Sequence, residues 1–127
     1  MVPFNISDTN AHTGIELGPR FAALDPRPTA VFCSADDLAV GLMSSLAREG
    51  VQVPHDLSVV GFDGFDLSLT ATPALTTIGQ NVEHKAHLAV SRLLAAIDGS
   101  GTLEDSSHDA PLEVSLLERS SVSPFGA

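Results

Sequence analysis

The sequence predicts an α/β fold built on a parallel β-sheet, and three patterns in its 127 residues support this prediction. Segments with helical spacing of apolar residues alternate with short apolar runs that are rich in β-branched residues. The connections between these segments are mostly a few residues long, and no internal repeat is visible. Alternating helices and strands with short connections are typical of a sheet with right-handed crossovers.

The first two predicted elements are a helix over 13–24 and a strand over 29–34. Thr13 and Glu16 have the spacing of a capping box at the start of the helix. Pro19 lies inside the helix, and because proline lacks an amide donor we expect a kink or an early end there. The strand is an almost continuous apolar run, which is typical of a strand covered on both faces.

A second helix is predicted from about Asp36 to Glu49, with leucines at every fourth position and Ser34 or Asp36 as its N-cap. Gly50 is placed to end this helix in a left-handed conformation. A second buried strand follows over 57–62.

The clearest helix of the sequence covers residues 82–97, with Asn81 as its cap and one apolar face. The other predicted segments of this part are a loop or short helix over 63–72, a strand over 75–79, a Gly/Ser/Asp-rich loop over 98–110 and a strand over 112–116.

Composition narrows the classes of function. Six basic residues against 16 acidic residues give a formal charge of −10, so the chain by itself is not expected to bind DNA or RNA. No apolar stretch is long enough for a membrane span and no secretory signal is visible, which predicts a cytoplasmic protein without a membrane partner. The single cysteine, Cys33, is interpreted as a small buried hydrophobic residue rather than a nucleophile.

Three phrases of the sequence resemble those of LacI/GalR-type bacterial transcription regulators. They are PTAVFCSADDLAVG at 28–41, VPHDLSVVGFD at 53–63 and PALTTIGQ at 73–80. The first resembles the family's PTA strand followed by an (A)ND-x-x-A-x-G helix start, and the others resemble its VPxDxSVVGFD and PxLTTIxQ segments. The ending LERSSV at 117–122 is similar to the family's R-x-S-T/V tail.

The resemblance implies a partial periplasmic-binding-protein-like (type I) core, without the helix-turn-helix head that contacts DNA in this family. Residues 1–79 would form the C-terminal lobe, residues 80–117 would cross back to the N-terminal lobe, and residues 118–127 would be a tail. The apolar face of helix 82–97 would then have little to pack on. Either the chain is a fragment of a longer protein or that helix has another partner.

Asp63 and Gln80 are the main candidates for ligand contacts, because each ends a predicted strand where open α/β sheets place their binding crevice. A carboxylate accepts charge-assisted hydrogen bonds from sugar hydroxyls, and an amide both donates and accepts. By resemblance they match the family's effector-binding Asp and pocket Gln. The alternatives are an Asp that caps the following turn and a surface Gln.

Ala35, Asp36 and Phe62 complete the predicted ligand-binding set. Ala35 stands where many family members have Asn, so a particular sugar specificity does not transfer. Asp36 is interpreted as a helix cap or as a residue that faces the cleft. Thr9 stands where members often have an aromatic residue that stacks on the effector.

A dimer interface is predicted after the second buried strand, where family members dimerise through the C-terminal lobe. The same residues could also form core of the lobe. They are Phe65, Leu67, Leu69 and Ala71.

The sequence contains none of the common catalytic and nucleotide-binding motifs G-x-S-x-G, Walker A and G-x-G-x-x-G. His84 and His87 lie one turn apart without a third metal ligand and are interpreted as solvated helix residues.

Taken together with the resemblance, these observations lead us to expect a homodimeric regulator core that senses a sugar-like or nucleoside effector and uses no cofactor. The alternatives are the sugar-binding protein of an ABC transporter and a truncated product without independent activity.

Overall fold

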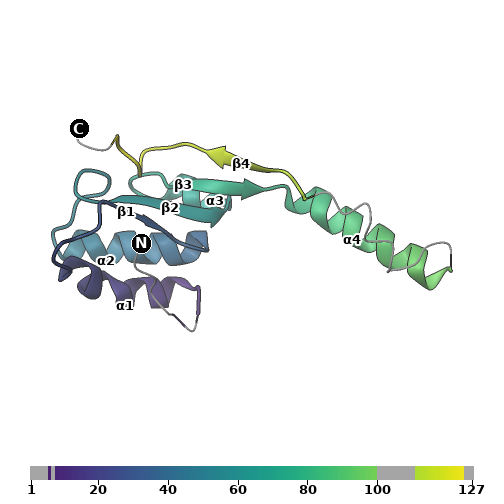
Figure 1. The fold of residues 1–127 in the computed structure, drawn as a ribbon, viewed down its shortest axis with the longest axis horizontal. Helices are drawn as coiled ribbons and strands as arrows, with labels where there is room; N and C mark the ends of the chain where they lie inside the picture. Colours follow the sequence, from purple (N-terminus) through teal and green to yellow (C-terminus); the bar gives the residue numbers. More distant parts are fainter. Residues whose placement is uncertain (1–5, 7, 100–110, 125–127) are drawn as a thin grey trace. The chain divides into compact units, whose positions relative to one another are not determined.

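The computed structural model describes residue 6, residues 8–99 and residues 111–124. Figure 1 shows the helices and strands along the chain. Their order is α1 (Ala11–Ala22), β1 (Ala30–Phe32), α2 (Asp36–Arg48), β2 (Ser58–Asp63), α3 (Asp66–Thr70), β3 (Thr76–Gln80), α4 (Val82–Ile97) and β4 (Val114–Leu117). Most of the predicted loop over 98–110 lies outside the described residues.

The strands form one sheet in the order β1-β2-β3-β4. Strand β2 pairs in parallel with β1 on one side and with β3 on the other. In the second pair, Phe62 is level with Ile78 and Asp63 is level with Gly79. Helix α2 connects β1 to β2, as parallel pairing requires of a crossover connection. The predicted α/β class with a parallel sheet is therefore confirmed.

The chain divides into two compact units. The first comprises Met1–Gly79 and Leu116–Ala127, and the second comprises Gln80–Ser115. The first unit contains the three helices α1, α2 and α3 together with the parallel strands, and its C-terminal residues return to it after the second unit.

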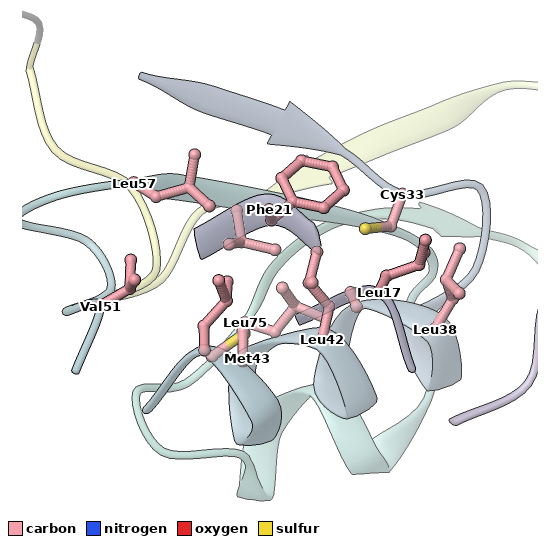
Figure 2. Close-up of a cluster of buried hydrophobic side chains, with 12 residues drawn as sticks. Leu17, Phe21, Cys33, Leu38, Leu42, Met43, Val51, Leu57 and Leu75 are labelled. Carbon is pink, nitrogen blue, oxygen red and sulfur yellow. The ribbon is translucent and has the colours of Figure 1, made fainter. Parts of the chain in front are cut away.

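The hydrophobic core of the first unit lies between the sheet and the helices α1 and α2, which cover the same face of the sheet (Figure 1). Figure 2 shows Phe21 of α1, Leu42 of α2 and the loop residue Leu57 among the side chains that meet there. The buried hydrophobic residues are Leu17, Phe21, Cys33, Leu38, Ala39, Leu42, Met43, Leu46, Val51, Leu57, Val59 and Leu75. Strand β2, which contributes Val59 to this core, ends at Asp63, at the edge of the sheet where open α/β proteins bind ligands.

Helix α1 begins two residues earlier than predicted. Asn10 is its N-cap, and the Asn10 side-chain oxygen accepts a hydrogen bond from the Thr13 amide at 2.9 Å. The predicted capping box of Thr13 and Glu16 was therefore wrong, because both residues already lie inside the helix. The helix also continues past Pro19 to Ala22, so it does not end early at the proline.

The predicted coverage of the first strand was also wrong. Val31 packs against the core, but Phe32 is 61% exposed. Strand β1 is at the edge of the sheet, and α1 and α2 cover only one of its faces. Its apolar run therefore does not indicate burial on both sides within the described residues.

Helix α4 agrees with the prediction in both its bounds and its cap. The Asn81 side chain accepts a hydrogen bond from the His84 amide at 3.0 Å. None of its residues is buried, and its exposed large apolar residues are Val82, Val90, Leu93, Leu94 and Ile97. Among the described residues, no helix has the length and apolar character needed to span a membrane.

Candidate functional site

Asp63 is the last residue of β2 and is half-buried. Its backbone φ is 119°, and no other non-glycine residue in the described part of the chain has a positive φ. A side chain in this region is sterically strained, and such strain is found where the surrounding structure over-determines the backbone, often at ligand sites. The structure therefore singles out Asp63 at the carboxyl end of a central strand, where sequence analysis placed a ligand contact.

Asp36, the first residue of α2, is completely buried and contacts the turn that follows Asp63. One carboxylate oxygen, Oδ2, accepts hydrogen bonds from the backbone amides of Gly64 and Phe65, each at 2.9 Å. The other oxygen, Oδ1, accepts from the hydroxyl of Thr77 at 2.5 Å. The carboxylate thus connects the start of α2 to the turn after Asp63 and to β3.

Two glycines make this arrangement sterically possible. A Cβ atom on Gly61 would collide with Asp36 Oδ1 and would lie 2.8 Å from Leu75 Cδ2. A Cβ atom on Gly64, whose φ is +79°, would lie 2.7 Å from the Cα atom of Gly79. The glycines on either side of the Phe62-Asp63 pair are therefore required by close packing.

Of the two roles expected for Asp36, the capping role is contradicted by the structure. The N-cap residue of α2 is Ala35, which makes no side-chain capping hydrogen bond, and Asp36 is in the first helical turn. Asp36 therefore does not cap the helix, because its carboxylate is used by Gly64, Phe65 and Thr77 instead. Its complete burial also leaves it no surface toward solvent.

Phe62 and Gln80 of the predicted ligand set lie in β2 and β3, whereas Thr9, which was outside that set, precedes α1. Phe62 is half-buried and meets Phe32 edge to face, with ring centroids 6.5 Å apart. Thr9 is exposed, and its backbone amide donates a hydrogen bond to the Asp8 side chain. Gln80 belongs to the second unit, where its side-chain oxygen accepts from Lys85 Nζ at 3.2 Å. In β3 it comes one position after Gly79, the residue that is level with Asp63. Its ligand role stays a prediction.

The predicted dimer residues divide by exposure. Phe65, Leu67 and Leu69 are 51%, 40% and 61% exposed, which is unusual for large apolar side chains so close together. Ala71 is half-buried and packs against the hydrophobic core. The three exposed residues lie at and within α3, directly after the turn that contains Asp63.

The polar residues of the tail, which lie within the LERSSV phrase, make contacts that the phrase itself did not predict. Arg119 Nη1 donates to the Ser68 hydroxyl at 2.8 Å and to the Leu75 carbonyl at 2.7 Å. Ser121 is completely buried and its hydroxyl accepts from the Thr76 amide at 2.8 Å. The tail therefore fixes the amino end of β3, and Asp36 binds Thr77, the next residue of that strand.

Cys33 and the two histidines of α4 are the remaining candidates for a reactive group. Burial raises the pKa of the Cys33 thiol to about 12, so the thiol is protonated at neutral pH and a poor nucleophile. His84 and His87 are both exposed on α4. Among the described residues, no group of three histidine, cysteine or acidic side chains is arranged to hold a metal ion.

Comparison with protein families gives a match to the periplasmic binding protein-like domain over residues 3–122. The chain belongs to this family. The parallel pairing of β1, β2 and β3 agrees with that membership. The periplasmic-binding-protein-like assignment also confirms the fold class predicted from the sequence phrases.

Two relatives of similar sequence are transcription repressors. The probable HTH-type transcriptional repressor ExuR of Bacillus subtilis is 42% identical over 85 residues, which are 67% of this chain and 26% of ExuR. The HTH-type transcriptional repressor PurR of Vibrio cholerae is 44% identical over 68 residues, which are 54% of this chain and 20% of PurR. The chain thus spans about a fifth to a quarter of the length of these relatives.

A solved structure of similar fold is the LacI family transcriptional regulator from Lactobacillus casei with bound sucrose. Its TM-score is 0.75 at 35% identity, over 89% of this chain and 41% of that protein. Together with the two repressors, this structure confirms the resemblance to LacI-type regulators.

Proposed function

We propose that this chain is the effector-sensing and dimerisation part of a cytoplasmic LacI-type transcription regulator, and that Asp63 contacts the effector. The observation that supports the proposal most directly is the strained backbone of Asp63 at the end of β2. In the proposed lobe arrangement, Met1–Gly79 with the returning tail Leu116–Ala127 is the C-terminal lobe, and Gln80–Ser115 belongs to the N-terminal lobe.

The effector is a neutral polyhydroxy molecule of the sugar or nucleoside class. A carboxylate can accept hydrogen bonds from two neighbouring hydroxyl groups, whereas it repels phosphate. The Lactobacillus casei relative was solved with sucrose and, in another crystal, with glucose, which supports this class. DNA would be contacted by a helix-turn-helix head outside these 127 residues, because the chain's charge of −10 disfavours a nucleic-acid surface of its own.

The test is a calorimetric titration of the intact regulator with a panel of sugars and nucleosides that includes glucose and sucrose. Asp63→Ala removes a charge-assisted hydrogen bond of about 1.5–3 kcal/mol, which corresponds to a roughly 10- to 150-fold weaker affinity. Asp66→Ala, which removes an exposed carboxylate three residues later, is the matched control and should bind as the wild type does. Unchanged affinity in Asp63→Ala, or no binding of any panel member by the wild type, would refute the proposal.

Dimerisation is proposed through the exposed apolar residues Phe65, Leu67 and Leu69. Placing a charge within such a contact leaves it desolvated and unpaired, so Leu69→Glu should convert the dimer to a monomer in sedimentation experiments. Thr70→Glu adds the same charge at the neighbouring exposed position and serves as the control. A Leu69→Glu protein that remains dimeric would exclude this surface.

A further inference from the structure

The buried carboxylate of Asp36 has a role that neither the ligand site nor the helix start explains. It is completely buried, yet it makes no capping contact in α2. All three of its described hydrogen bonds go to residues 28, 29 and 41 positions away in the sequence. A buried carboxylate that only stabilised its own helix would not need these distant donors.

Two of its three described hydrogen bonds are with the turn that follows β2. Asp63 and Gly64 have φ values of 119° and 79°, so two consecutive residues have left-handed backbone. The backbone amides of Gly64 and Phe65, the two residues after Asp63, both donate to Asp36 Oδ2. Successive backbone amides of this kind form a concave anion site, and here the anion is a side chain of the protein itself.

We propose that Asp36 is a positioning residue, whose carboxylate holds Asp63 in its strained backbone conformation and thereby aims the Asp63 side chain. The role of Asp63 as a ligand contact rests on the proposed function, but the positioning itself does not. In this proposal Asp36 acts through Asp63, because its own surface is entirely enclosed by protein.

The surroundings are shaped for this carboxylate. Gly61 leaves the space that Oδ1 occupies, and a side chain there would collide with it. Thr77 of β3 donates its hydroxyl to the same oxygen. The Asp36 carboxylate therefore links Thr77 of β3 to the turn after β2, so a movement of either segment would disturb the other.

The experiment measures the backbone of Asp63 directly, by the three-bond HN–Hα coupling in NMR spectra of the labelled chain without ligand. Since this coupling depends on φ, it is small for the wild-type conformation and large for an extended strand residue. In Asp36→Ala the anion is lost, so Asp63 should relax to negative φ and show a large coupling. Asp37→Ala, at the neighbouring exposed position of α2, should keep the small one.

Two conservative variants keep the test decisive if Asp36→Ala does not fold. Asp36→Asn retains an oxygen for the two amides but loses the charge. It should keep the small Asp63 coupling, while hydrogen exchange at Gly64 and Phe65 becomes faster by on the order of tenfold. Thr77→Val removes only the bond to Oδ1 and should leave the exchange of those two amides nearly unchanged.

A purely stabilising role would lower the unfolding midpoint of the variants without altering Asp63. A small coupling in folded Asp36→Ala, or unchanged amide exchange in Asp36→Asn, would therefore overturn the inference. Its failure is distinguishable from failure of the proposed function, because the NMR experiment contains no ligand. If Asp63→Ala binds effector normally while Asp36→Ala changes the Asp63 coupling, the positioning holds and the ligand role does not.

Discussion

Ser121 and Val59 are joined by two hydrogen bonds. The Val59 amide donates to the Ser121 carbonyl at 2.8 Å, and the Ser121 hydroxyl donates to the Val59 carbonyl at 2.6 Å. The same hydroxyl accepts from the amide of Thr76, the first residue of β3. The tail therefore satisfies backbone groups of both central strands, and the serine of the R-x-S phrase has a structural reason.

Replacing Ser121 by alanine should lower the stability of the first unit. The substitution leaves the Thr76 amide and the Val59 carbonyl without their hydroxyl partner, and each unsatisfied buried group costs about 1–3 kcal/mol. The change is measured by urea unfolding followed by circular dichroism. Ser120→Ala, at an exposed position, should stay within about 0.5 kcal/mol of wild type. Equal effects of the two changes would contradict the assigned role of the hydroxyl.

Gly64 and Gly50 provide a second matched pair, because their φ values of 79° and 76° are nearly equal. An alanine at either position has a left-handed backbone, which costs about 1–2 kcal/mol. Only at Gly64 would the new Cβ also meet a backbone atom, the Cα of Gly79, at 2.7 Å. Gly64→Ala should therefore lower the unfolding free energy by about 1–3 kcal/mol more than Gly50→Ala. Denaturant titrations of both variants would show whether the difference exists.

Leucine-to-alanine changes should separate the core from the uncovered helix. Leu42 is 1% exposed, so Leu42→Ala should reduce the unfolding free energy by about 2–5 kcal/mol. Leu93 of α4 is 54% exposed, and Leu93→Ala should change it by less than about 0.5 kcal/mol. If Leu93→Ala in the 127-residue chain were as costly as Leu42→Ala, α4 would have a packing partner in solution.

Because of Cys33, the free energy of unfolding depends on pH in the alkaline range. Its pKa rises from 9.0 to about 12 on folding, so the folded protein retains a proton that the unfolded chain releases. This contribution to stability is complete below about pH 9 and is lost as the pH rises toward 12. Unfolding free energies measured across this range should fall more steeply for wild type than for Cys33→Ala. A thiol reagent should label Cys33 slowly in the native protein and rapidly in urea.

Local patterns predicted the elements well where the signal lay within a few neighbouring residues. The periodicity of α4 and its cap at Asn81 are examples, and so is the left-handed Gly50 after α2. The start of α1 was misjudged because Thr13 and Glu16 also fit a capping box, while Asn10 was three residues upstream. The exposure of Phe32 depends on which elements cover the sheet, which a single segment does not encode.

The candidate site was predictable only in part. The end of a buried strand pointed to Asp63, but nothing near it in the sequence indicated its backbone conformation. The partners of Asp36 are 28 to 41 residues away, so its role needed the tertiary structure. The sequence phrases did contain the participants, since Asp36, Gly61 and Thr77 each lie in a different one of the three.

The return of Leu116–Ala127 to the first unit has a consequence for biosynthesis. While the nascent chain is still attached to the ribosome, β2 and β3 can pair, yet the partners that Arg119 and Ser121 supply have not been translated. At about 5–20 residues per second, the 36 residues of Gln80–Ser115 delay them by roughly 2–7 seconds. A message truncated after Ser115 would therefore release a lobe whose central strands lack their last hydrogen-bonding partners, a ready substrate for chaperones and proteases.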